Sequence, residues 1–392
     1  MWAFLSCLSS SHVLCVLAGF LAGVLAPQCQ WPNIRFTRPK ATEDGWGFGK
    51  RNDRLYGLEH GKLNLELPPK SMWMNMGFWR DTDDFPTACQ ALLVEVLRKA
   101  KLLEDDNTGK GKSSPTTPPR LRSGLKRLSI LDLGFGCGDQ TAYLVQLARI
   151  PLKYVGITLN YRQYRFAQNR LGPSCSSSDK GTKRDVQLFC EDAARTDSWP
   201  EGLRSAVSSL NNNNRNNATD QNTKKNNTSQ QSSAEETWVL ALDSLYHFHP
   251  SRQPVLSLAA QDLNASLMAF DLLVSDSASW HQRWALKLVA WLGDCPVRGG
   301  GPFLTRAQYA EMLVEAGYDR NKIELHDVTG DVFEPLARYM RRRGGELEDV
   351  GLTLGSLNVA RLVFGWWARS GVLEAVIVVA RKSSSPDAKG KA

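Results

Sequence analysis

The 392-residue sequence predicts an α/β fold with a doubly wound, mostly parallel sheet of seven strands. Three observations lead to this prediction. A glycine-dense turn over 134–138 joins an apolar run, 129–133, to a helical pattern over 140–149. Apolar runs and helical patterns then alternate along the chain, which is typical of consecutive βαβ units. A last apolar run over 373–380 provides the seventh strand.

The other elements follow from apolar runs and from helical spacing. A helix over 85–103 precedes the sheet, because Cys89, Leu93 and Val96 fall on one stripe. Gly317 is a plausible C-cap for the helix near the end of the core. We expect strands at 153–158, 186–190, 238–243, 270–276 and 323–328, and helices near 161–171 and 305–316.

Composition divides the rest of the chain into segments. Residues 30–124 form an N-terminal helical cap and linker, and 125–383 form the core. An Asn-, Ser- and Gln-rich insertion over 204–236 is too poor in apolar residues to pack, so we expect it to be disordered. A lid-like insertion spans 330–370, and a disordered tail spans 384–392. Core packing is the expected role of an aromatic patch at Phe364, Trp366 and Trp367, with contact to a membrane or substrate as the alternative.

The N-terminal segment, 1–29, has no Lys, Arg, Asp or Glu and approaches the ~20 residues of a membrane span. Arg35, Arg38 and Lys40 follow it, which favours a signal anchor with the rest of the chain in the cytosol. A cleaved signal peptide is one alternative, although the usual basic start is missing. A disordered leader on a cytoplasmic protein is the other.

Net charge and cysteine use exclude some functions. The net charge is +8, but part of it lies in linkers and tails, and no basic motif is interleaved with aromatic residues. We therefore expect no nucleic-acid partner. The eight cysteines include no C-x-x-C pair, so no metal site is expected and the thiols are read as reduced.

The glycine-dense turn has the order Asp132-x-Gly134-x-Gly136-x-Gly138. Glycines let a ligand approach the backbone, and the following helix N-terminus offers free N–H groups. A nucleotide-like cofactor at the end of the strand is one interpretation. A turn that needs glycine only for its geometry is the other. The dinucleotide fingerprint, G-x-G-x-x-G, does not match.

This order resembles motif I of class I S-adenosyl-L-methionine (SAM) methyltransferases. The resemblance implies a Rossmann-like sheet whose last strand is antiparallel, between the fifth and sixth. It also implies SAM as cofactor, beside Asp132 and the three glycines. A segment over 73–79 is similar to an aromatic element that helps cover the cofactor in many small-molecule methyltransferases.

Two further segments carry the resemblance. Residues 156–163 are similar to a variant found in cyclopropane-fatty-acid synthases and related lipid and small-molecule methyltransferases. This similarity implies that Thr158, Leu159 and Gln163 line the adenosine pocket. After the third strand, Asp192 and Ala193 stand where the family binds the adenine ring.

Residues 242–248 resemble the segment that faces the methyl group in phosphoethanolamine-type and quinone-type methyltransferases. His247 is a candidate base, because an imidazole ordinarily titrates near physiological pH. A structural histidine is the alternative. Asp243 is expected to touch the cofactor or to orient the site. Tyr246 is the second candidate catalytic residue. It stands where cyclopropane synthases carry Glu, which counts against cyclopropanation.

The sequence therefore predicts a SAM-dependent methyltransferase acting on a small-molecule or lipid acceptor. Two alternatives stay open: a non-catalytic scaffold of the same fold, and a nucleotide-cofactor oxidoreductase. The oxidoreductase would need G-x-G-x-x-G and an acidic residue after the second strand, and both are absent.

Overall fold

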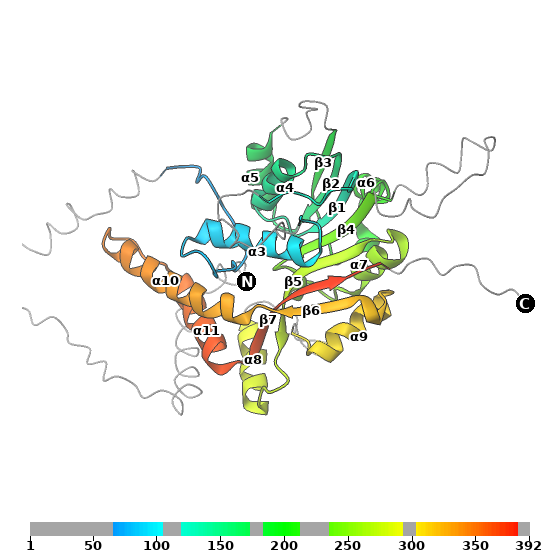
Figure 1. The fold of residues 1–392 in the computed structure, drawn as a ribbon. Coiled ribbons are helices and arrows are strands. Elements are labelled where there is room, and N and C mark those ends of the chain that lie inside the picture. Colours follow the sequence, from blue (N-terminus) through cyan, green and yellow to red (C-terminus); the bar gives the residue numbers. More distant parts are fainter. Residues whose placement is uncertain (1–65, 105–118, 173–182, 212–234, 293–302, 383–392) are drawn as a thin grey trace, which may run out of the picture.

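A computed structural model describes residues 66–104, 119–172, 183–211, 235–292 and 303–382. Its centre is a seven-stranded sheet in the order β3-β2-β1-β4-β5-β7-β6 (Figure 1). The strands are β1 (Arg127–Leu133), β2 (Leu152–Thr158), β3 (Arg184–Cys190), β4 (Glu235–Leu242), β5 (Ser266–Val274), β6 (Ile323–Asp327) and β7 (Leu373–Ala380). Neighbours among β1 to β5 pair in parallel, whereas β7 is antiparallel to both β5 and β6. The predicted fold class is confirmed.

Helices cover both faces of the sheet. Apolar side chains of α3, α4, α8, α10 and α11 pack on one face, and those of α6, α7 and α9 pack on the other. The helices are α3 (Phe85–Lys99), α4 (Asp139–Leu147), α5 (Tyr161–Leu171), α6 (Glu201–Ser208), α7 (Gln253–Ser257), α8 (Trp280–Leu292), α9 (Arg306–Ala316), α10 (Phe333–Glu348) and α11 (Leu357–Ser370).

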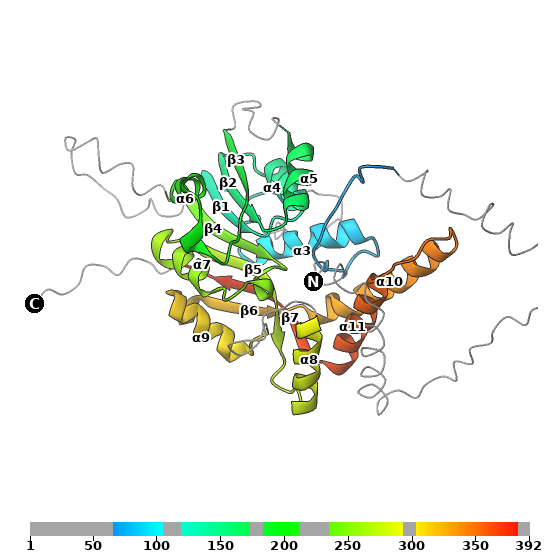
Figure 2. The same cartoon turned by 180° about the vertical axis from the view of Figure 1, so that it is seen from behind.

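Two helices extend beyond the sheet. Figures 1 and 2 show α10 and α11 side by side, projecting on the side where the parallel strands end. They account for most of the predicted lid-like insertion. The aromatic patch is buried as expected, since Phe364, Trp366 and Trp367 are at most 5% exposed.

Several sequence expectations are wrong at their boundaries; the helix predicted over 85–103, for example, ends at Lys99. β5 spans Ser266–Val274 rather than 270–276, and it is buried along its whole length. The insertion predicted over 204–236 is shorter, because α6 ends at Ser208 and β4 begins at Glu235. Apolar side chains on one side of α6 join the core and hold that helix in place.

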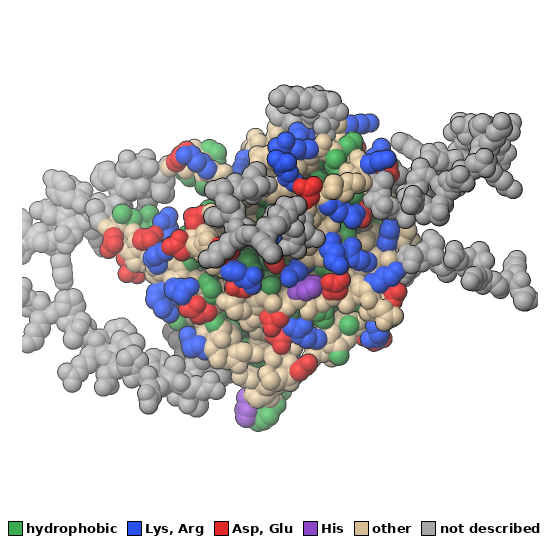
Figure 3. All heavy atoms as spheres, in the orientation of Figure 1, with side chains coloured by type: hydrophobic (Ala, Val, Ile, Leu, Met, Phe, Trp, Pro, Cys, Tyr) green, Lys and Arg blue, Asp and Glu red, His purple; other side chains and the backbone are tan. Residues whose placement is uncertain are grey.

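Several expectations concern residues outside the described ranges. They include the segment over 1–29, most of the Asn-rich insertion and the C-terminal tail. Within the described ranges, no helix combines the length and apolar character needed to cross a bilayer. Figure 3 shows basic and acidic side chains interspersed over one face of the molecule.

Candidate active site

A cleft of about 400 Å³ lies where four parallel strands end. Gly134 follows β1, Thr158 ends β2, Asp192 comes soon after β3, and Asp243 follows β4. All four residues line the cleft, so segments that are far apart in sequence meet at one edge of the sheet. In open α/β sheets this edge is the usual place for a ligand.

The three glycines of the turn have different roles. All have positive φ, at +101° for Gly134, +63° for Gly136 and +88° for Gly138. A Cβ at Gly134 would lie 2.9 Å from the Cβ of Ser244, and one at Gly138 would lie 2.9 Å from the Cβ of Ala167. A Cβ at Gly136 would have only Met74 near it, at 3.7 Å. Gly134 and Gly136 line the cleft, whereas Gly138 does not.

Asp132 does not line the cleft, which corrects the expectation of a direct cofactor contact. Its fully buried carboxylate accepts bonds of 2.9 and 2.7 Å from the Gln140 amide and another from the Tyr154 hydroxyl. Burial raises the pKa of Asp132 to about 7, and these bonds oppose the rise. The residue therefore fixes β1 to the first turn of α4.

The predicted adenosine side of the cleft comes from the β2–α5 connection. Thr158 Oγ1 donates to Gln163 Oε1 at 3.0 Å, and within the described ranges the Gln163 amide nitrogen has no partner. Leu159 lines the cleft with 73% of its surface exposed, which puts it at the rim. Asn160 begins α5 by accepting from two backbone N–H groups.

Asp192 and Ala193 also line the cleft. One oxygen of Asp192 accepts from Ala194 N at 2.9 Å, and Arg195 Nε lies 3.5 Å from the other. The Trp199 indole donates to the Asp192 carbonyl at 2.9 Å. These contacts fix the direction of the carboxylate but leave acceptor capacity, because an ionised carboxylate accepts up to about four bonds.

The predicted methyl-transfer side lies after β4. Asp243 has φ +64°, and its Oδ1 accepts from the Tyr246 hydroxyl at 2.6 Å. Burial raises the pKa of Asp243 to about 6, and the Tyr246 bond opposes the rise. Tyr246 itself is buried and does not line the cleft, so its described role is to support Asp243.

His247 lines the cleft from the short turn Leu245–His247, with its ring 4.3 Å from that of Tyr246. Burial lowers the pKa of His247 well below the ordinary value. The expectation that His247 titrates near physiological pH is therefore wrong. The imidazole is neutral at pH 7, and Asp243 is the neighbouring cleft carboxyl whose pKa is raised, to about 6.

A strap of residues 72–75 covers the cleft, and sequence reasoning did not find what holds it. Met72 N donates to both Asp139 oxygens, at 3.2 and 3.1 Å. Arg170 lies 2.8 Å from Asp139 and donates to the Lys70 carbonyl at 2.9 Å. Only the aromatic element over 73–79 gave a signal in the sequence, because Arg170 lies 100 residues after Lys70, its partner just before the strap.

Two observations decide the fold. Antiparallel β7 lies between β5 and β6 in the sheet, and the cleft lies beside the glycine turn. It is the class I methyltransferase fold. No protein-family model matches the sequence, and no curated protein matches it.

Solved structures of methyltransferases and cyclopropane synthases align with the chain at low identity. A cyclopropane synthase from Mycobacterium tuberculosis is 14% identical, over 79% of this chain and 90% of that one, with a TM-score of 0.47. A mycolic acid cyclopropane synthase complexed with SAH is 13% identical, over 83% of this chain and 95% of that one, with a TM-score of 0.48. Phosphoethanolamine N-methyltransferase 2 from Haemonchus contortus, in complex with SAM, is 13% identical. The alignment covers 66% of this chain and 50% of that one, with a TM-score of 0.45.

Proposed function

We propose that this protein is a SAM-dependent methyltransferase that acts on a small-molecule or lipid acceptor. One observation carries the proposal: a single cleft gathers the glycine turn, Gln163, Asp192 and Asp243 at the carboxyl edge of the sheet. The cleft also suits a nucleoside, since it combines apolar walls with a few polar groups.

The residues present fit the proposed cofactor. The space beside Gly136 is open toward the cleft, so a ligand can lie against bare backbone. The Gln163 amide nitrogen, which has no partner among the described residues, can donate to a ribose hydroxyl, and Asp192 can accept from an exocyclic amine. Gly134, Thr158, Leu159 and Ala193 complete this proposed binding surface.

SAM would supply a methyl group on a sulfonium, together with its own leaving group. The protein then has to position the acceptor and exclude water. With a pKa of about 6, Asp243 is a stronger base than an ordinary carboxylate and stays ionised at pH 7. We assign to Asp243 the role of the base that removes a proton from the methyl acceptor. Neutral His247 then orients the acceptor rather than serving as the principal base.

Calorimetry on the full chain tests the cofactor. We expect SAM and S-adenosylhomocysteine to bind and NAD not to bind. Gln163→Leu should weaken S-adenosylhomocysteine binding about tenfold, because one hydrogen bond is lost. Gln168→Leu, on the exposed side of the same helix, is the matched control and should bind normally. Affinity for NAD alone would favour the oxidoreductase alternative and refute the proposal.

Transfer of label tests catalysis and finds the acceptor. The full chain is incubated with methyl-labelled SAM and with fractionated lipid and metabolite extracts. A labelled product in one fraction supports the proposal. Tight S-adenosylhomocysteine binding without a labelled product in any fraction would favour the non-catalytic scaffold.

Association with a membrane through residues 1–29 is a further part of the proposal. It predicts that the full chain sediments with membranes and that a chain starting at residue 30 does not. Equal distribution of the two chains would refute the anchor.

A further inference from the structure

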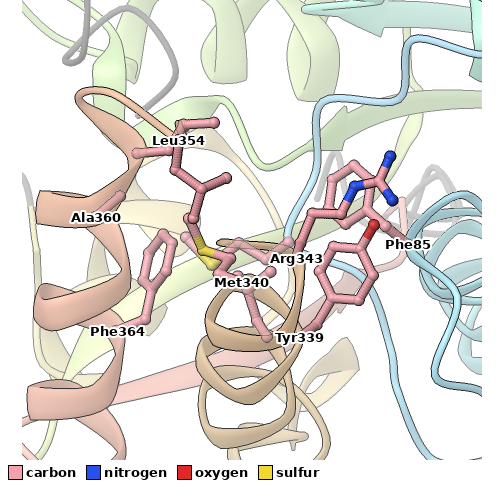
Figure 4. A pocket seen from close by; sticks show the side chains of 10 residues that line it. Phe85, Tyr339, Met340, Arg343, Leu354, Ala360 and Phe364 are labelled. Atoms are coloured by element: carbon pink, nitrogen blue, oxygen red, sulfur yellow. The ribbon is translucent and has the colours of Figure 1, made fainter. Parts of the chain in front are cut away.

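A second cavity, of about 120 Å³, lies between α10, α11 and the start of α3. Figure 4 shows Met340 of α10 pointing toward Phe364 and Ala360 of α11, whereas Tyr339 and Arg343 point toward Phe85 at the start of α3. Its lining is almost entirely carbon and sulfur. The lining residues are Met76, Phe85, Leu336, Tyr339, Met340, Arg343, Leu354, Leu357, Ala360 and Phe364.

The single charged side chain in this lining is turned away from the apolar interior. Arg343 is exposed, and its guanidinium donates to Glu346 at 2.9 Å. By contrast, Leu336, Met340 and Ala360 are at most 6% exposed. The cavity therefore offers no buried charge to a ligand, and a hydrocarbon is the group that it favours.

The cavity adjoins the proposed methyl-transfer side of the cleft. Asn75 lines the cleft and the next residue, Met76, lines the cavity. The backbone of Met76 also lies near enough to Asp243 to oppose the rise of its pKa. Met76 therefore lies between the cavity and the carboxylate that we propose accepts a proton from the methyl acceptor.

The partition between the two spaces is well held. Asn75 Oδ1 accepts from Gly77 N at 2.9 Å, and the Trp79 indole donates to the Met76 carbonyl at 2.9 Å. Phe78 N donates to the Ala88 carbonyl of α3 at 2.8 Å. The backbone is fixed, whereas the unbranched Met76 side chain can change rotamer to admit a ligand.

A run of aromatic rings also joins the two spaces. The Tyr246 ring, next to that of His247, lies 5.8 Å from Phe303. Phe303 lies 6.3 Å from Trp367, which lies 5.5 Å from Phe364 in the cavity wall. Aromatic rings therefore connect the proposed reaction side to the cavity.

We infer that this cavity receives an apolar group of the methyl acceptor. An engineered apolar cavity of about 150 Å³ stays dry and binds benzene, so this one suits a single ring or a short branched chain. The acceptor class is then an amphipathic small molecule: its hydrocarbon part lies against Met340 and Phe364, and its reactive atom lies beside Asp243. This inference rests on the proposed function.

Fluorobenzene is the probe, observed by fluorine NMR with the full chain. We expect a saturable shift in the wild type. Ala360→Phe should abolish it, because the added ring fills the cavity. Leu362 lies on the same helix and is 45% exposed, so Leu362→Phe is the matched control and should keep the shift. Leu357→Ala enlarges the cavity and should gain binding of fluoronaphthalene, which keeps the test decisive if Ala360→Phe does not fold.

Two parallel measurements separate this inference from the proposed function. S-adenosylhomocysteine should bind normally to every folded variant, since none of these side chains lines the cleft. Normal S-adenosylhomocysteine binding without a fluorobenzene shift would overturn the inference alone, whereas loss of S-adenosylhomocysteine binding in the wild type would overturn the proposed function. Butylbenzene should also slow label transfer to the active extract fraction. Undiminished transfer at saturating butylbenzene would overturn the assignment of the cavity to the acceptor.

Discussion

Alanine at Gly134 and at Gly136 should separate the stability of the glycine turn from its role in binding. Both residues have positive φ, and an L-residue there costs about 1–2 kcal/mol. The surroundings differ. The new Cβ at Gly134 would lie 2.9 Å from the Ser244 Cβ, whereas at Gly136 the nearest atom, in Met74, would lie at 3.7 Å.

The expected magnitudes follow from that difference. Gly134→Ala adds overpacking of about 1–3 kcal/mol to the backbone cost, so it should lower the free energy of unfolding by about 2–5 kcal/mol. Gly136→Ala should lose only the backbone cost of about 1–2 kcal/mol. Its methyl group would instead occupy cleft space, so S-adenosylhomocysteine should bind at least about tenfold more weakly.

Urea unfolding followed by tryptophan fluorescence measures the first quantity, and calorimetry measures the second. Equal losses of stability in the two variants would contradict the packing argument. Full ligand affinity in Gly136→Ala would contradict the position of the ligand beside this residue.

Three further predictions concern the strap, the base and a buried ion pair. Arg170→Met should weaken S-adenosylhomocysteine binding in calorimetry, because the chain just before the strap loses its contact at Lys70. Arg165→Met, on the exposed side of α5, should leave binding unchanged. The pKa of Asp243 is raised to about 6, and its ionised form is the proposed base. Turnover should therefore fall about tenfold per pH unit below about pH 6, and a kcat that stays constant there would exclude this base. Arg252→Met removes the cation 2.8 Å from fully buried Asp271 and leaves that carboxylate only the Tyr309 hydroxyl and Leu272 N as described donors. The free energy of unfolding in urea should fall by about 3–5 kcal/mol, and a loss below about 1 kcal/mol would contradict a buried, uncompensated charge.

Short-range signals made much of the fold predictable. Thr305 and Gln308 form a capping box at the start of α9, and Gly317 ends that helix in the left-handed conformation. The strand predicted over 373–380 has the observed bounds of β7. Each of these signals lies within a few residues of the element that it marks, so no tertiary information was needed.

Long-range pairing limited the prediction of the site. Asp132 precedes the glycine turn in sequence, but Tyr154 on the next strand and Gln140 draw its carboxylate into the core. The shift of the His247 pKa comes from burial, which depends on the packed fold and not on neighbours in sequence. Helix α8 was missed as well, because its exposed Trp280 and Trp284 blur the alternation of apolar and polar faces.

The antiparallel position of β7 has a consequence for synthesis of the chain. β6 hydrogen-bonds only to β7 within this sheet, and β5 is left with one open edge until β7 arrives. On the ribosome, β1 to β5 can pair as they emerge, but β6 has no sheet neighbour until Ala380 has been made. Nascent chains that stall before Leu373 therefore leave one edge of β5 open and β6 wholly unpaired, and such edges are sites for chaperone binding or aggregation.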